Sequence, residues 1–454
     1  MIGKKSRRLV ALSVTMAIAF GTQASASQSI SGSGATFPQQ FQASATAAFN
    51  AATGNNATYA NPGGGSSKGV TDFANGLTDF GGTDSAVSSS VRIGFDWVYV
   101  PYVGGAIAVA YRLDELGGAT LALSPETLNG IFGGVITKWN DPSIVNDLKS
   151  APTWANSKKK SDLKGATALI ANGAPGSAIV TVSAIPSLLR SVRGKSVEIV
   201  DAKTKKVLKK ATMSKGEVSI TFGAKEGVDY SVRLNGKELA NFREVDVKMP
   251  DKTITVVYRS DGSGTTNNFC SFMRAAANPG WAVNNSFTSC IPGGSGFVAG
   301  LGSRFQGQSG SANVSNYIAD NSGSIGYTEV SFVTDASRAA KGMKAANIRN
   351  EAGRYVAPTA ANTSSFLTGS TVDSRGFVTF NYKQATNTSA YPITAITYML
   401  GKTAKSAKND TVKQYAEWIL NTYAPANAEA LGYAPLSGAL RTAALAQAAK
   451  VSAN

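Results

Sequence analysis

The chain has 454 residues and a net charge of +16, with 43% apolar and 16% charged residues. That length allows two or three domains, and the composition is that of a loop-rich globular protein. Histidine is absent, which excludes Ser-His and Cys-His catalytic pairs and His-ligated metal sites. Two cysteines are too few for a Cys-only zinc or iron–sulfur site, so we expect no metal and no other cofactor.

Residues 1–26 have the pattern of a secretory signal peptide. Four basic residues between Lys4 and Arg8 precede a mostly apolar run from Leu9 to Phe20, and Ala24-Ser25-Ala26 fits a cleavage site. The run is shorter than the ~20 residues that a membrane-spanning helix needs. We therefore expect a mature chain that begins near Ser27 and is exported to a periplasm-like compartment or secreted beyond it.

The two cysteines, Cys270 and Cys290, have 19 residues between them. In an oxidising compartment we expect them to form one disulfide, worth about 3 kcal/mol in the loop-entropy model. Two separate thiols are the alternative. Either arrangement gives the cysteines a structural role.

Segments 27–150 and 253–454 share one pattern, in which short apolar strands, Gly/Ser loops and Ala-rich helices alternate. Strands that alternate with helices predict an α/β fold. In chain order, the clearest elements are strands at Trp97–Val100 and Ala106–Ala110, a helix at Pro125–Phe132, a strand at Ile254–Tyr258, and helices at Asp410–Tyr423 and Leu440–Ala449.

Segment 150–252 differs from its surroundings in charge and in pattern. It carries 19 Lys and Arg against 10 Asp and Glu, so it holds +9 of the +12 that remain without the signal peptide. After a cluster at Lys158–Lys160, strand-like runs follow one another without helices, at Ala178–Val182, Ser196–Val200, Val218–Phe222 and Tyr230–Leu234. This predicts a small all-β module inserted in a loop. Its lysine runs are most simply a solvated face, and a binding surface for an anionic partner is the alternative.

One arrangement occurs three times: a loop rich in Gly and Ser precedes a helical pattern. These loops are 32–38, 63–67 and 259–265, and the last begins with Arg259. Glycine lets the backbone approach closely, hydroxyls can donate, and a helix N-terminus presents unpaired N–H groups and positive charge. Each loop alone is explained by ordinary helix capping. Three together indicate a site for a small oxyanion, and none matches a nucleotide-binding pattern.

A carboxylate, Asp84, closes the stretch Asp79-Phe80-Gly81-Gly82-Thr83-Asp84. It follows apolar and glycine residues, so partial burial is expected. A role as a helix or turn cap is the alternative.

At these residues the chain resembles the periplasmic phosphate-binding proteins of phosphate-specific ABC transporters. The likeness covers about 27–148 and 253–445, and the Arg259 loop is its most specific part. The matching motifs, in family order, are Gly32-Ser33-Gly34-Ala35-Thr36-Phe37-Pro38, Asp79-Phe80-Gly81-Gly82-Thr83-Asp84, Arg259-Ser260-Asp261-Gly262-Ser263-Gly264-Thr265, Gly323-Ser324-Ile325-Gly326-Tyr327 and Tyr391-Pro392-Ile393-Thr394.

The resemblance implies an α/β fold of two lobes, the clamp-like type II binding-protein fold, joined by crossover strands. The first lobe would comprise 27–100 and 331–454, and the second 101–149 and 253–330. The module at 150–252 is foreign to the family pattern.

The resemblance also implies the phosphate ligands. These would be Thr36 and the backbone N–H of Phe37 from the first loop, Ser66 from the second, and Arg259, Ser263, Gly264 and Thr265 from the third, with Asp84 as the acceptor for the phosphate proton. The chain departs from the family at Lys68, where glycine is common, and at Gly82-Thr83, which replaces a commoner Ala-Ser pair.

The implied function is high-affinity binding of inorganic phosphate by a monomer that hands it to the membrane permease of an ABC transporter. No specific nucleic acid is expected. One alternative is a secreted phosphatase-like enzyme with a Ser or Thr nucleophile; the absence of histidine and of an evident metal cluster or general base beyond Asp84 disfavours it. The other is an interaction protein that uses the basic insertion on an anionic surface, which is compatible with phosphate binding.

Overall fold

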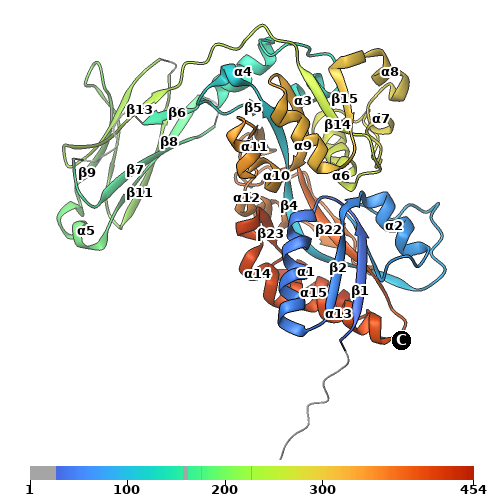
Figure 1. Cartoon of the computed structure of the whole chain (residues 1–454). Coiled ribbons are helices and arrows are strands. Elements are labelled where there is room, and N and C mark those ends of the chain that lie inside the picture. The colour runs from blue at the N-terminus through green and yellow to red at the C-terminus, as the bar shows by residue number, and fades with distance from the viewer. Residues whose placement is uncertain (1–26, 157–161, 175, 226) are drawn as a thin grey trace, which may run out of the picture.

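The computed structural model describes residues 27–454 except 157–161, 175 and 226. The predicted signal peptide and the whole Lys158–Lys160 cluster lie outside the described residues. Two α/β lobes share one ten-stranded sheet with the path β15-β14-β16-β4-β22-β3-β1-β2, and a smaller β-rich module projects from them (Figure 1). This is the predicted two-lobe α/β class.

Each end of the sheet is a group of three parallel strands. One group is β1 (Ser29–Gly34), β2 (Asn56–Gly64) and β3 (Phe80–Thr83). The other is β14 (Thr255–Arg259), β15 (Phe305–Gln308) and β16 (Ser324–Glu329). Two long antiparallel strands between them, β4 (Trp97–Arg112) and β22 (Thr394–Lys402), carry the chain from lobe to lobe.

The strand β4 corrects the sequence prediction of two separate strands at Trp97–Val100 and Ala106–Ala110. It runs unbroken for 16 residues, pairing with β22 along its first part and with β16 along its last. Gly104 and Gly105 do not end it, because the side chains of Leu367 and Phe37 occupy the space beside them. Both glycines keep their pairing with β22, so the two predicted strands are parts of one.

The helices pack on both lobes, and α3 has the bounds predicted for it. Those of the first lobe are α1 (Gln39–Thr53), α2 (Ser66–Ala74), α13 (Ala407–Trp418), η4 (Ile419–Tyr423), α14 (Ala424–Asn427), η5 (Glu429–Leu431) and α15 (Gly438–Ala448), with strand β23 (Tyr433–Pro435). Those near the second lobe are η1 (Asp114–Leu116), α3 (Pro125–Phe132), α4 (Pro142–Ser150), α6 (Gly264–Phe272), η2 (Met273–Ala277), α7 (Phe287–Cys290), α8 (Gly294–Gly300), η3 (Gly302–Arg304), α9 (Gly310–Asp320), α10 (Val330–Val333) and α11 (Ala336–Ala340). The remaining elements are β5 (Ala122–Leu123), β17 (Lys344–Ala345), β18 (Asn347–Arg349), β19 (Tyr355–Val356), α12 (Ala360–Leu367), β20 (Thr371–Val372) and β21 (Val378–Thr379).

The inserted module is a β-sandwich with a core of its own. Its sheets are β10-β9-β12-β13-β6 and β11-β8-β7, and a hydrophobic cluster separate from that of the lobes fills the space between them. The strands are β6 (Trp154–Asn156), β7 (Ala166–Asn172), β8 (Ser177–Ala184), β9 (Ser196–Asp201), β10 (Val207–Thr212), β11 (Glu217–Gly223), β12 (Tyr230–Leu234) and β13 (Lys237–Glu244). All four runs predicted in this segment lie in strands.

The sequence analysis predicted an all-β module, and the structure corrects this prediction. The module contains the helix α5 (Pro186–Val192), which begins with proline at its first position and buries Val192. Proline suits the first turn because its fixed φ is helical and its missing N–H would have no partner there. The helix lies at the end of the module away from the lobes (Figure 1).

Candidate anion-binding site

The candidate site lies at the carboxyl ends of the parallel strands in both halves of the sheet. Strands β1, β2, β14 and β15 each lead into a helix, α1, α2, α6 and α9 respectively. Ligands of open α/β sheets bind at this edge, because the loops and helix N-termini gather there. The three loops that the sequence singled out are joined here by a fourth, before α9.

The first loop brings Thr36 to the other lobe. The Thr36 side chain is buried, and its hydroxyl lies 2.9 Å from that of Ser311 at the start of α9. Phe37 places its ring in the core, and its carbonyl accepts a hydrogen bond of 2.8 Å from Tyr433. The backbone N–H of Phe37 is therefore held in place next to Thr36. Gly34 has φ +131 and lies against the Gly82 carbonyl, so a side chain would not fit there.

The second loop brings Ser66 into contact with both lobes. Its hydroxyl lies 3.3 Å from the Asp84 carboxylate and accepts from the backbone N–H groups of Asp84 (3.2 Å) and Gly264 (3.1 Å). A Cβ on Gly264 would lie 2.5 Å from the Ser66 hydroxyl and 2.7 Å from the Asp84 Cβ. The loops that carry these residues therefore meet more closely than any side chain at position 264 would allow.

The two departures from the family pattern have local explanations. Lys68 is an exposed residue of α2 that forms an ion pair of 2.7 Å with Asp72, which also accepts a hydrogen bond from Ser33. Burial works against the charge of Asp72, but these two partners hold its pKa below the usual value. Gly82 has no room for a Cβ beside the Tyr59 hydroxyl. Both departures therefore shape the surrounding loops and leave Ser66 and Asp84 in place.

The third loop supplies a buried cation. Arg259 is 2% exposed, and its Nε donates to the Asp261 carboxylate at 2.6 Å. A second guanidinium nitrogen, Nη1, donates to the Ser311 hydroxyl at 3.1 Å. Asp261 also accepts from the backbone N–H of Gly310 at 2.9 Å. The guanidinium is thus held in one orientation between β14 and α9.

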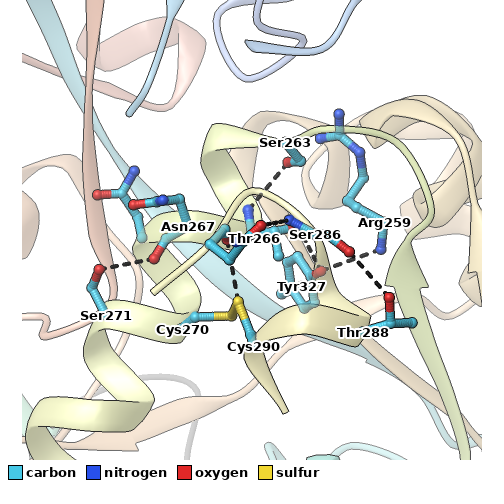
Figure 2. The surroundings of a disulfide bond; sticks show 12 residues. Arg259, Ser263, Thr266, Asn267, Cys270, Ser271, Ser286, Thr288, Cys290 and Tyr327 are labelled. Atoms are coloured by element: carbon cyan, nitrogen blue, oxygen red, sulfur yellow. Dashed lines mark hydrogen bonds between the residues drawn. A yellow bond between two sulfur atoms is a disulfide. The ribbon is translucent and has the colours of Figure 1, made fainter. Parts of the chain in front are cut away.

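The remaining members of the third loop sit at the N-terminus of α6. The Ser263 hydroxyl caps this helix, accepting from the backbone N–H of Thr266 at 3.1 Å. The Thr265 hydroxyl donates to Glu329 at 3.1 Å. Figure 2 shows how Tyr327 fixes this helix tip, since its hydroxyl bonds Thr266 at 2.7 Å and accepts from the backbone N–H of Arg259 at 3.2 Å.

The predicted disulfide between Cys270 and Cys290 is confirmed, and it supports the same helix (Figure 2). It joins α6 to the end of α7, with the two Cα atoms 6.1 Å apart. In the segment just before α7, Asn285 accepts from the Ser263 backbone N–H at 2.9 Å and donates to Ser67 of the opposite lobe at 3.1 Å. The cross-link therefore fixes a segment that touches the site loop.

Two residues of the site, Ser311 and Glu329, were missed by the sequence analysis. Ser311 lies in the run Ser309-Gly310-Ser311, which follows β15 and begins α9 just as the three predicted loops begin theirs. The same signal of glycine and serine before a helix would have found it. Glu329 is 1% exposed at the end of β16, two residues after the Gly323–Tyr327 motif. An isolated glutamate after a strand gives no sequence signal of its own.

Two carboxylates of the site are buried deeply enough to hold protons near neutral pH. Burial raises the pKa of Asp84 to about 7, and the negative charge of Glu329 acts in the same direction. Burial likewise raises the pKa of Glu329 to about 7. Asp84 Oδ1 is buried without a well-formed hydrogen bond among the described residues, and the buried Thr397 hydroxyl lies close enough to lower the pKa of Asp84. An unpaired carboxylate oxygen in a dry site is a strong acceptor for any proton that a ligand brings.

Together these groups can bind a small oxyanion between the lobes. All eight residues that the sequence singled out lie at the junction, where hydroxyls, helix N-termini and one guanidinium meet. The polar groups come from both lobes, because Thr36, Ser66 and the acceptor Asp84 face Arg259, Gly264 and Ser311. A bound anion would therefore hold the lobes together.

Two lobes with a polar site between them define the class of bilobal binding proteins. The PBP superfamily domain matches residues 21–233 and 234–422, and the chain belongs to that superfamily. The match covers both lobes and runs through the module.

Individual relatives agree with this assignment. The chain is 24% identical to the phosphate-binding protein PstS of Xylella fastidiosa over 412 residues, which cover 90% of this chain and 81% of that protein. It is 25% identical to PstS3 of Mycobacterium bovis, over 74% of this chain and 62% of that protein. Among solved structures, a DING protein superposes with a TM-score of 0.56 at 19% identity, covering 92% of this chain and 93% of that one. A phosphate-binding protein from Stenotrophomonas maltophilia gives 0.52 at 15% identity, with the same coverage.

The part of the chain that the structure describes has neither a membrane-spanning helix nor a cluster of metal ligands. None of its helices has the length and apolar character needed to cross a bilayer. Within the same residues, no group of three or more acidic or cysteine side chains is placed to hold a metal ion.

Proposed function

We propose that this protein binds inorganic phosphate outside the cytoplasm and delivers it to the membrane permease of an ABC transporter. The observation that carries the proposal is the meeting of four helix N-termini, a buried guanidinium and a buried carboxylate at the junction of two lobes. The names of the PstS relatives support phosphate as the ligand. These relatives are binding proteins rather than enzymes, which supports a transport role over catalysis.

The proposed ligand set is the one that the resemblance implied. Arg259 donates three of its five N–H groups to Asp261 and Ser311, which leaves two for phosphate oxygens, and a guanidinium fits such an anion well. The hydroxyls of Thr36, Ser66, Ser263 and Thr265 and the backbone N–H of Phe37 supply other donors. The Gly264 N–H belongs to the proposed set too, and it would turn to the anion from the Ser66 hydroxyl, to which it donates at 3.1 Å. These are neutral groups at helix N-termini, where the helix dipole also favours negative charge.

Asp84 is proposed to select phosphate over sulfate. Hydrogenphosphate carries a proton that it can donate to the unpaired Asp84 Oδ1, and sulfate carries none. A sulfate oxygen would therefore face the carboxylate directly, and an uncompensated charge contact in a buried site costs several kcal/mol. About 4 kcal/mol corresponds to roughly a thousandfold difference in affinity.

The test is calorimetric titration of the mature protein with inorganic phosphate, using a matched pair of serine variants. Ser66→Ala removes a buried hydroxyl of the site, and Ser143→Ala removes an exposed one on α4, away from the site. We expect Ser66→Ala to weaken phosphate binding at least about tenfold, the worth of one hydrogen bond to a charged group, and Ser143→Ala to change it little. Equal effects of the two variants would contradict the proposed site. A phosphomonoesterase assay with and without divalent metal tests the enzyme alternative, and we expect no turnover.

A second function, binding of the module to an anionic surface, is favoured by one observation. Five exposed cations lie on α5 or on the turns that are hydrogen-bonded beside it, and none has an ion-pair partner among the described residues. They are Arg190, Arg193, Lys195, Lys215 and Lys237. Reversing the charge of the first three should abolish sedimentation with vesicles that contain anionic lipid at low salt, whereas reversing Arg92 and Lys450 on the lobes should not. Loss of binding in both variants, or in neither, would contradict this assignment.

A further inference from the structure

A second buried carboxylate, Glu329, stands beside the proposed phosphate site. Its Oε1 accepts from the hydroxyls of Ser311 at 2.9 Å and Thr265 at 3.1 Å, and its Oε2 accepts from Thr328 at 3.1 Å. Thr265 is one of the proposed ligands, and Ser311 touches two others, Thr36 and Arg259. Glu329 therefore contacts the hydroxyls that line the site rather than the anion itself.

The direction of these hydrogen bonds depends on whether Glu329 is ionised. An ionised carboxylate only accepts, so Thr265 and Ser311 must each use their single hydroxyl proton on it. Thr36 Oγ1 accepts a hydrogen bond from the Ser311 backbone N–H at 3.3 Å. It also lies 2.9 Å from the Ser311 hydroxyl, which already donates its proton to Glu329 and can only accept from Thr36. The Thr36 proton is therefore directed to Ser311. In this state both Thr36 and Thr265 present oxygen lone pairs, and no protons, to an incoming anion.

A proton on Glu329 reverses this arrangement. The acid O–H can then donate to the Ser311 hydroxyl, whose second acceptor position is filled by Arg259 Nη1. Ser311 then turns its own proton from Glu329 to Thr36 Oγ1, 2.9 Å away, and no longer accepts from Thr36, so the Thr36 proton becomes available to a ligand. The protonated Oε1 is also a poor acceptor, which releases the proton of Thr265. One proton taken up at Glu329 thus provides two hydroxyl donors at the site.

The charges around Glu329 favour the same event. The groups that face it are the guanidinium of Arg259 from β14, Asp84 beyond β3, and the buried phenol of Tyr433 from β23. When all are ionised, the guanidinium of Arg259 and the three carboxylates of Asp84, Asp261 and Glu329 have a net charge of −2. A dianion would enter that field at a large cost, because charges interact strongly where water is excluded. The raised pKa values of Asp84 and Glu329 show that burial already opposes two ionised carboxylates.

We propose that Glu329 is a positioning residue that takes up a proton from solvent when phosphate binds, and so turns the hydroxyls of Thr36 and Thr265 toward the anion. The inference rests on the proposed phosphate site. Asp84 keeps its separate role as the acceptor for the proton that the ligand carries.

Proton uptake has a defined effect on affinity. Where Glu329 is ionised in the unliganded protein and protonated in the complex, phosphate affinity falls by up to tenfold for each pH unit. Above about pH 8, inorganic phosphate is almost entirely the dianion, so its own titration adds little to this slope. Above about pH 8, the slope of phosphate affinity against pH therefore measures proton uptake by the protein.

The experiment is titration of the mature protein with inorganic phosphate near pH 8.5, in two buffers that differ in ionisation enthalpy. The difference in observed heat gives the number of protons taken up. We expect close to one for the unchanged protein, close to zero for Glu329→Gln, and an undiminished value for Asp84→Asn. Glutamine mimics the protonated acid, so Glu329→Gln should also bind phosphate with a flatter pH dependence.

Three results would overturn the inference: no proton uptake by the unchanged protein, the same uptake by Glu329→Gln, or loss of uptake in Asp84→Asn. If Glu329→Gln fails to fold, the slope of phosphate affinity against pH in the unchanged protein decides, and a flat profile between about pH 8 and 9.5 contradicts the proposal. If the unchanged protein does not bind phosphate at all, the proposed function fails instead, so the two failures are distinguishable.

Discussion

At the scale of single residues, the site is governed by which buried groups have partners. Asp84 keeps one carboxylate oxygen without a partner among the described residues, whereas Asp261 uses both oxygens on Arg259. Asp261 therefore neutralises the guanidinium and orients it. Asp84 is left available for the acceptor role that we propose for it.

The selectivity assigned to Asp84 predicts the behaviour of Asp84→Asn. An amide removes the charge that repels sulfate, so the ratio of phosphate to sulfate affinity should fall at least about tenfold. Competition of the two anions, followed by calorimetry, measures the ratio. Asp72→Asn is the matched control, because Asp72 is also buried but pairs with Lys68 outside the site. An unchanged ratio in Asp84→Asn would remove the role given to this residue.

The pKa of Glu329 predicts how stability depends on pH. Because its pKa in the folded protein lies near 7, above the value of about 4 in the unfolded chain, the folded state holds more protons between these values. The stabilisation is therefore complete below about pH 4 and is lost as the pH rises through about 7. Glu329→Gln should lose less stability than the unchanged protein between about pH 5 and pH 8. Urea unfolding midpoints at the two pH values measure this, and equal losses would contradict the shift.

At the scale of elements, most of the site-forming loops could be predicted from sequence, and their partners could not. Glycine and serine before an amphipathic helix indicate a helix N-terminus, and the loops before α1, α2 and α6 have that form. Sequence does not show that β4 continues past Gly104 and Gly105, because the side chains that fill this space come from residues 37 and 367. Likewise, Glu329 is chemically important only because α6 and α9 bring Thr265 and Ser311 to it.

The close approach of the loops at Gly264 predicts a sensitive position. A Cβ there would meet Ser66 and would lie 3.0 Å from the Asp84 backbone, so Gly264→Ala should keep the lobes from meeting. We expect phosphate binding to weaken at least about tenfold while the circular dichroism spectrum is unchanged. Gly296→Ala in α8 is the control, since nothing lies within 4 Å of a Cβ at that position. Normal phosphate affinity in Gly264→Ala would show that the loops do not need this contact.

At the scale of the whole molecule, the two lobes share one sheet and the module stands apart. The division into lobes at residues 100 and 330 stays a prediction. The pairing of β17 with β4, and of β18 with β5, favours placing the return to the first lobe after Val356. The module has its own core, and its two ends lie together, since Val245 donates to the carbonyl of Thr153 at 2.8 Å.

This independence predicts that the module can be removed. Replacing residues 154–244 with a short Gly/Ser linker should leave phosphate affinity within about twofold of the original, because no residue of the site lies in the module. Calorimetry measures the affinity, and thermal unfolding checks that the lobes remain folded. A large loss of affinity in a folded variant would show that the module takes part in binding.

The most direct test of the account is a comparison of phosphate and sulfate binding by the unchanged mature protein at one pH. The geometry predicts a single phosphate site per chain and an affinity for sulfate that is lower by roughly a thousandfold. Similar affinities for the two anions, or no phosphate binding, would contradict a site in which helix N-termini bind the anion and Asp84 accepts a hydrogen bond from its O–H group.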